Sequence, residues 1–108
     1  MKEDQFSLDE TTLSVDLSDA TQAVKESRFE DALNLLKVLL KENPNHIDIL
    51  YLSAVSTRFL KQFEVSLKHI ERLLFNAPDM GRAYQELGHL NRDMGNEEKA
   101  VMHYRQAC

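Results

Sequence analysis

The side chains best suited to metal or acid-base chemistry in this 108-residue chain are its four histidines. They are scattered along the sequence, and none forms a His-x-x-x-His or Cys-His pair with a neighbour: His46, His69, His89 and His103. A helix would place His89 and Asp93 on one face, because they are four residues apart. Two ligands without a third do not make a metal site. We therefore predict no metal and interpret this pair as solvated side chains.

The glycines offer no phosphate-binding loop. Gly81, Gly88 and Gly95 are isolated residues at a spacing of seven. A structural role accounts for each, since the first precedes a helix, the second permits close helix packing and the third ends a helix. No nucleophile stands in a recognisable catalytic setting. The sequence thus predicts no catalytic residue, no cofactor and no enzymatic activity.

A period of 34 residues organises most of the chain. Residues of the same kind recur in register one and two periods apart: Pro78 and Pro44; Ala100, Ser66 and Ala32; Tyr104, Ile70 and Leu36; Ala107, Leu73 and Leu39; Phe63 and Phe29. A fixed period with large, small and apolar residues in phase is an internal repeat. Each unit must bury its apolar face against its neighbours, because a chain of this length cannot fill several separate cores.

The third unit resembles a tetratricopeptide repeat. It carries Tyr84-x-x-Leu87-Gly88, then Gly95, then Ala100-x-x-x-Tyr104-x-x-Ala107. The second unit departs from the pattern, with Leu50 for the aromatic, Ser53-Ala54 for Leu-Gly and Lys61 for the turn glycine. The resemblance covers residues 13–108 and implies an all-α, right-handed superhelical array of about three helix hairpins, an α-solenoid. Its units are residues 13–46, 47–80 and 81–108.

Apolar periodicity and stop signals predict six helices and no strands. We expect them near residues 15–26, 29–43, 47–60, 63–76, 80–94 and 97–108. Ser27-x-x-Glu30 has the form of a capping box and is expected to start the second helix. Pro44 limits that helix, Gly95 ends the fifth in a left-handed conformation, and Asn96 caps the sixth.

Charge is concentrated at the N-terminus. The formal charge is −5, and residues 1–20 hold six acidic side chains against Lys2, whereas the rest has 12 of each sign. We interpret residues 1–12 as a flexible acidic segment. The alternative is a short helix that begins at Ser7-x-x-Glu10, which has the form of a capping box. The overall acidity argues against nucleic-acid binding. A lone cysteine, no signal sequence and no apolar run of roughly 18 residues indicate a reducing, cytoplasmic setting without membrane contact.

In the family, the first helix of each pair lines the concave, ligand-binding side. The candidate peptide-binding residues are therefore Tyr51, Val55, Arg58, Phe59, Arg82, Gln85, His89 and Arg92. Arg58 and Arg92 are 34 residues apart, so stacking would set them side by side as a positive surface for an acidic peptide. Reversing both charges would then abolish binding and leave stability unchanged. An alternative remains open for each kind of side chain. Phe59 packs under the neighbouring unit, and the arginines pair with Asp48, Asp93 or solvent.

Chaperone-binding members of the family hold a peptide carboxylate with a clamp of Lys, Asn and Arg. The corresponding positions here are Leu17, Thr21, Leu52, Arg82 and Glu86. Only Arg82 suits a carboxylate, so chaperone-tail binding is not expected.

The resemblance implies a non-catalytic module that binds a protein or extended peptide. The alternative is an accessory region of a larger enzyme, as in bacterial proteins that join such repeats to a sulfotransferase. The last helix has no proline stop, and we expect a longer protein to follow. Met94, Val101 and Tyr104 would then be partly bare and available for self-association.

Overall fold

The computed structural model describes the backbone of residues 2–108 and the side chains of residues 13–108. It contains six helices, α1 (Lys2–Lys25), α2 (Phe29–Glu42), α3 (Ile47–Phe59), α4 (Phe63–Asn76), α5 (Gly81–Asp93) and α6 (Glu97–Ala107), and no strand within this range. Helices α2 to α6 match the predicted bounds to within one residue at each end. The prediction for α1 was wrong at its start, because the helix begins at Lys2 rather than near Val15. The flexibility predicted for residues 1–12 lies outside the described side chains and stays a prediction.

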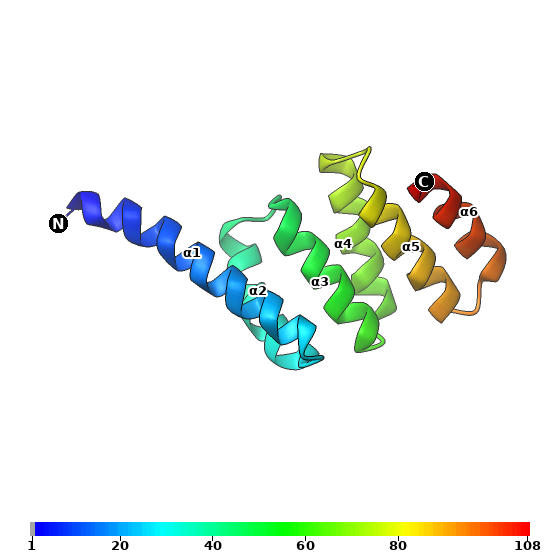
Figure 1. Ribbon diagram of the computed structural model, residues 1–108, viewed down its shortest axis with the longest axis horizontal. Helices are drawn as coiled ribbons and strands as arrows, with labels where there is room; N and C mark the ends of the chain where they lie inside the picture. Colours follow the sequence, from blue (N-terminus) through cyan, green and yellow to red (C-terminus); the bar gives the residue numbers. More distant parts are fainter. Residues whose placement is uncertain (1) are drawn as a thin grey trace.

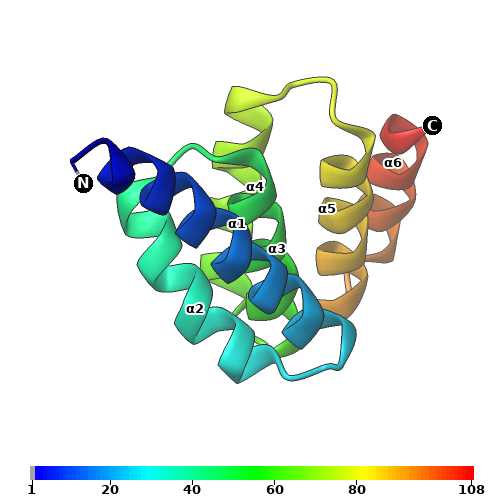
Figure 2. The same ribbon diagram turned by 60° about the vertical axis from the view of Figure 1, so that its left-hand side comes forward.

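The helices form three antiparallel hairpins that follow one another along the molecule. Helix α1 packs on α2, α3 on α4 and α5 on α6, and each hairpin also contacts the next (Figures 1 and 2). The arrangement is the predicted α-solenoid. Helices α1, α3 and α5 come first in their hairpins and lie in sequence on one side, with direct contacts between α1 and α3 and between α3 and α5.

The hydrophobic core is shared between units, as the repeat predicts. The first cluster joins α1 and α2 to Ile49 of α3. Two further clusters each combine α3, α4 and α5, one around Leu50, Leu73 and Ala83, the other around Ala54, Ile70 and Leu90. Because no cluster is confined to one hairpin, each hairpin depends on its neighbour for burial.

The turns inside the three hairpins repeat one backbone geometry. Ser27, Lys61 and Gly95 have positive φ angles of 61°, 64° and 83°. After each, the next amide N–H donates to a carbonyl five residues back, as in Arg28 to Ala23 at 2.8 Å. This is the Schellman end of a helix. Gly95 is confirmed as a left-handed terminator, and the Lys61 position adopts the same conformation without a glycine.

Two predicted caps are not formed. Helix α2 begins at Phe29 as predicted, but its N-cap residue is Arg28 and no side chain caps it. Ser27 is committed to the left-handed turn, so it cannot close a capping box. Asn96 stands at the N-cap of α6 but makes no capping side-chain bond. In contrast, His46 Nδ1 accepts the Ile49 N–H at 3.4 Å and caps α3.

Gly88 permits close packing of α5 and α6, as predicted. A Cβ atom at this position would lie 2.5 Å from a ring carbon of Tyr104. The Tyr104 ring therefore occupies the space that a side chain at residue 88 would need. The Tyr104 hydroxyl lies 2.7 Å from Nδ1 of His89.

Candidate functional site

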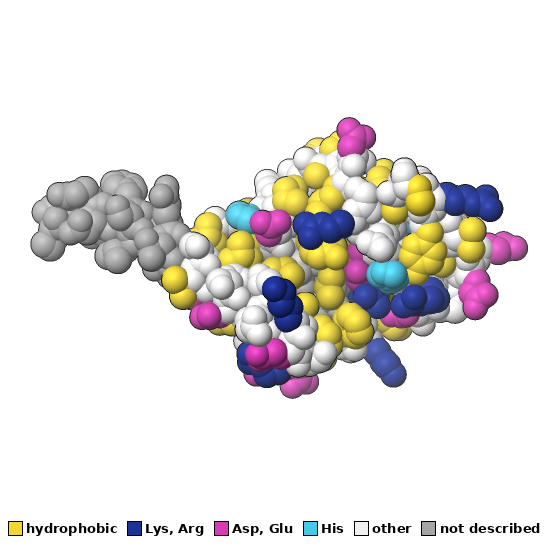
Figure 3. Space-filling view, viewed as in Figure 1, with side chains coloured by type: hydrophobic (Ala, Val, Ile, Leu, Met, Phe, Trp, Pro, Cys, Tyr) yellow, Lys and Arg dark blue, Asp and Glu magenta, His cyan; other side chains and the backbone are white. Residues whose placement is uncertain are grey.

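A groove lies between the first helices of the three hairpins, and we call it the α1–α3–α5 groove. It is lined by Leu17 and Thr21 of α1, Asp48, Tyr51 and Leu52 of α3, and Arg82 of α5. On the face shown in Figure 3, apolar side chains lie beside basic and acidic ones. The groove can therefore contact both an apolar side chain and a charged or polar group of a ligand.

Arg82 is the cation of this groove. Its guanidinium lies over the Tyr51 ring, 4.5 Å from the ring centroid. It is 4.0 Å from Asp48, and both charged side chains are more than half exposed. Such a loose, solvated pair contributes little to stability and leaves the guanidinium accessible to a ligand. Burial, and then the charge of Glu86, raise the pKa of Tyr51, so its ring stays neutral beneath Arg82.

Arg58 does not face a ligand, and its predicted exposure was wrong. Its side chain is buried, and its Nε donates to the equally buried carboxylate of Glu86. One terminal nitrogen donates to Asp93 at 2.9 Å. Burial opposes the charged form, but these hydrogen bonds and charges outweigh it and raise the pKa of Arg58 above its ordinary value. Arg58, Glu86, Asp93 and Arg92 are called the Arg58 cluster below.

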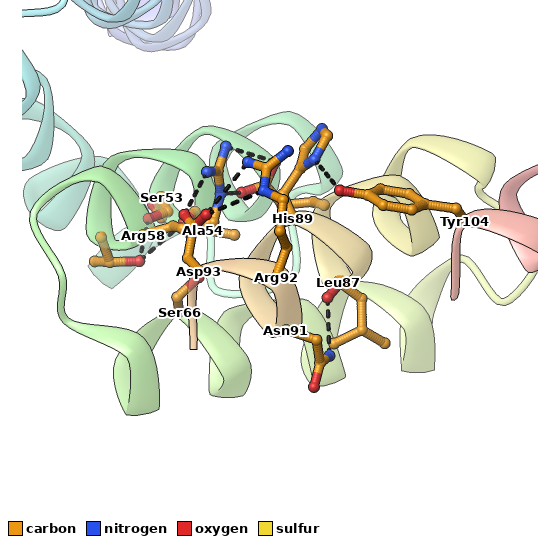
Figure 4. Close-up of polar contacts among 12 residues, drawn as sticks. Ser53, Ala54, Arg58, Ser66, Leu87, His89, Asn91, Arg92, Asp93 and Tyr104 are labelled. Carbon is orange, nitrogen blue, oxygen red and sulfur yellow. Dashed lines mark hydrogen bonds and ion pairs between the residues drawn. The ribbon is translucent and has the colours of Figure 1, made fainter. Parts of the chain in front are cut away.

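Arg92 closes the other side of this cluster. Its NH2 group is 3.2 Å from Asp93, which thus lies between two arginines (Figure 4). Partial burial disfavours the carboxylate, but the hydrogen bonds from Arg58 and Arg92 prevail and hold the pKa of Asp93 below its ordinary value. The two arginines are offset by two carboxylates, so the predicted positive surface around Arg58 and Arg92 was wrong. The alternative, in which the arginines pair with acidic neighbours, describes the structure.

Phe59 packs against a neighbouring unit and also remains partly exposed, so it agrees with both interpretations of this residue. Its ring stacks on Phe29 of the first hairpin, with centroids 4.4 Å apart and planes 3° from parallel. The Arg58 guanidinium lies 4.5 Å from the centroid of the same ring. Phe59 is nevertheless 52% exposed. It therefore connects two units and still offers apolar surface, whereas Val55 is buried and offers none.

The remaining candidates lie along α5. Gln85 is exposed and borders a depression between α5 and α6, together with Arg82 and Tyr104. His89 turns toward Tyr104 in Figure 4. Burial lowers the pKa of His89; the charge of Glu86 partly opposes this effect, whereas the charge of Arg58 adds to it. The structure thus brings Tyr51 and Arg82 together in one groove and places His89 and Arg92 farther along the same helix.

Sequence reasoning misjudged Glu86. It was aligned as a clamp position unsuited to a carboxylate, but it is 2% exposed and bonded to Arg58. One signal for the groove was present, because Leu17, Thr21, Leu52 and Arg82 had been aligned as clamp positions and all four line it.

No group of three His, Cys, Asp or Glu side chains within residues 13–108 is placed to hold a metal ion. Within the same part of the chain, no helix has the length and apolarity needed to span a membrane. At the C-terminal end, Met94, Val101 and Met102 are each about half exposed, whereas Tyr104 is partly covered. Self-association through this end stays a prediction.

The fold is similar to that of solved MamA structures. MamA AMB-1, in a P212121 crystal, superimposes with a TM-score of 0.79 at 19% identity, covering 97% of this chain and 62% of that one. MamA MSR-1 superimposes with a TM-score of 0.78 at 20% identity, covering 88% of this chain and 55% of that one. MamA 41-end from Desulfovibrio magneticus RS-1 superimposes with a TM-score of 0.76 at 22% identity, covering 88% of this chain and 54% of that one. The chain spans little more than half the length of these structures.

No family model and no curated protein matches the sequence. The structural similarity to MamA, a tetratricopeptide-like protein, supports the α-solenoid fold and nothing beyond the fold.

Proposed function

We propose that this chain is a non-catalytic module that binds an extended protein segment in the α1–α3–α5 groove. The proposal rests on the position of Arg82, which lies over the Tyr51 ring and is only loosely paired with Asp48. It presents a cation beside the apolar side chains of Leu17 and Leu52. An arginine that is already oriented loses less freedom when it binds a carboxylate.

The ligand that fits this chemistry is an extended peptide with Asp, Glu or a terminal carboxylate next to an apolar residue. The carboxylate would take the outer edge of Arg82, and the apolar side chain would contact Leu17 and Leu52. Asp48 can accept a peptide N–H, because it is more than half exposed and only loosely paired with Arg82. The helical-repeat fold supports the proposal, because such arrays bind extended partners along the side formed by successive first helices. No specific observation favours the alternative role as an accessory region of an enzyme.

The test uses an array of synthetic 12-residue peptides that alternate acidic and apolar residues. A matched array replaces each Asp and Glu by Asn and Gln. We expect the intact chain to bind acidic members preferentially, and Arg82→Glu and Tyr51→Ala each to weaken the best one by about tenfold. Arg105→Glu makes the same charge change on exposed α6, outside the groove, and should have no effect.

Calorimetry with the purified variants supplies the affinities, and circular dichroism verifies that helicity is retained. Equal weakening by Arg82→Glu and Arg105→Glu would mean that only net charge matters. That result, or the absence of any binding peptide, would reject the groove as the site.

A further inference from the structure

A second surface with binding chemistry lies on the outer side of α4. Phe75 is 86% exposed, which makes it the most exposed large apolar side chain among residues 13–108. It shares a shallow pocket with Lys68, Glu71, Arg72 and Asn76 of α4, and with Asn45 of the α2–α3 loop. We call this the Phe75 face. Lys68, Arg72 and Phe75 follow one another at spacings of four and three, so they lie on one side of the helix.

Arg72 differs from Arg58, Arg82 and Arg92 in its partners. Its Nε donates to the neutral side chain of Asn45 at 2.9 Å, and Asn76 donates to the same oxygen at 3.5 Å. No ion pair involves Arg72 within the described residues, whereas Arg58, Arg82 and Arg92 each have a carboxylate within 4.0 Å. Its guanidinium is thus oriented but retains its charge and its terminal donors. Together with Lys68, it outweighs the single negative charge of Glu71.

An oriented arginine beside an exposed aromatic ring is typical of an interaction hot spot. The Phe75 face is therefore complementary to a segment that carries a carboxylate next to an apolar side chain. The N-terminal segment of this chain has that composition, with Phe6 close to Asp4, and Leu8 directly before Asp9 and Glu10. We propose that the Phe75 face binds the acidic N-terminal segment, residues 1–12, of a second copy of this chain.

The binding must join two copies because α1 and α4 are kept apart within one chain. Helix α1 is held on α2 by Leu13, Leu17 and Val24, and it makes no contact with α4 in the described structure. Its N-terminal half projects from the hairpins, away from α4 (Figure 1). The α1–α3–α5 groove offers one cation, Arg82, beside the anion Asp48, whereas the Phe75 face offers the two cations Lys68 and Arg72 against Glu71.

Sedimentation velocity of the full chain over a range of concentrations tests this proposal. We expect reversible association that weakens with added salt, because it depends on charge. Arg72→Glu and Phe75→Ser should each weaken it about tenfold or more. Both residues are on the surface, so helicity should remain intact. Arg105→Glu, on exposed α6, is the matched control and should associate as the parent chain does. Val101→Ser tests the rival surface at the C-terminal end, and under this proposal it also associates as the parent chain does.

A mixing experiment assigns the two partners. Asp9→Lys with Glu10→Lys should also abolish association of the full chain. When this variant is mixed with Arg72→Glu, opposite charges face each other again and hetero-association should return.

Several outcomes would overturn the proposal. It fails if the parent chain stays monomeric at about 1 mM, or if Val101→Ser rather than Phe75→Ser prevents association. It also fails if Arg82→Glu weakens association as much as Arg72→Glu does, or if the Phe75 face binds phosphatidylserine vesicles instead of a second copy. Loss of association in Arg82→Glu would assign the N-terminal segment to the α1–α3–α5 groove and would reject only the Phe75 face. The other outcomes leave peptide binding in the groove untouched, so the two proposals fail separately.

Discussion

Replacing Arg58 by methionine should destabilise the chain severely, although the sequence suggested an exposed, dispensable charge. The change would leave Glu86, which is 2% exposed, with its charge unpaired. Breaking a buried ion pair by removing one partner costs about 3–5 kcal/mol. Folded domains have about 5–15 kcal/mol of stability in total, so this loss is a large fraction of it. The prediction that reversing Arg58 leaves stability unchanged is therefore withdrawn.

The matched control is Arg92→Met, which removes the same charge from the same cluster. The Arg92 side chain is 52% exposed, and its pair with Asp93 should contribute about 0–1 kcal/mol. Urea unfolding followed by circular dichroism at 222 nm measures both free energies. Combining Arg58→Met with Glu86→Leu should recover much of the loss, because no buried charge is left without a partner. Equal losses from Arg58→Met and Arg92→Met would refute the claim that burial makes the Arg58 pair different.

Three further predictions concern the turns and the histidines. Lys61→Gly should stabilise the chain by about 0.5–1 kcal/mol, because Lys61 holds a φ of 64° that costs a non-glycine residue energy. Gly95→Ala should destabilise by about 1 kcal/mol through its φ of 83° alone, since nothing lies within 4 Å of an added Cβ. Thermal unfolding measures both, and a lower melting temperature for Lys61→Gly would contradict the reasoning. Burial lowers the pKa of His69 and His89 below the ordinary 6.5, so the unfolded chain binds protons first as the pH falls. Stability should be complete above pH 6.5 and decline below it through the folded-state pKa values. His69→Gln should flatten this dependence in urea titrations at several pH values, and an unchanged slope would contradict it.

Local sequence signals were enough to place most of the helices. The 34-residue period, Pro44 and Pro78 defined where α2 to α6 begin and end, because proline and apolar periodicity act within a few residues. The start of α1 was missed for the same reason. Residues 2–14 have no apolar stripe comparable to that of α2, and the only local helix signal was the capping-box pattern Ser7-x-x-Glu10, which was given less weight than the acidic composition.

The charge network could not be predicted from spacing along the chain. Arg58 pairs with Glu86 and Asp93, which are 28 and 35 residues away. A period of 34 aligned Arg58 with Arg92 and suggested two like charges in a row. The acidic partners come from the packing of α3 on α5, and only the folded structure shows that this packing buries Arg58. In the same way, Ser27 was assigned as a cap because its sequence pattern fits one, while the Schellman turn places it in the left-handed conformation.

The Arg58 cluster and the groove are connected through the same two helices. Asp48, Tyr51 and Arg58 all belong to α3, whereas Arg82, Glu86 and Asp93 belong to α5. The buried pair between Arg58 and Glu86 fixes these helices relative to each other, and Arg82 reaches the Tyr51 ring from that fixed position. We therefore expect Arg58 to set the geometry of the groove without contacting the proposed ligand itself. A binding defect in an Arg58 variant would report a displaced α5, and only variants of Tyr51 and Arg82 that retain the fold can identify the ligand contact itself.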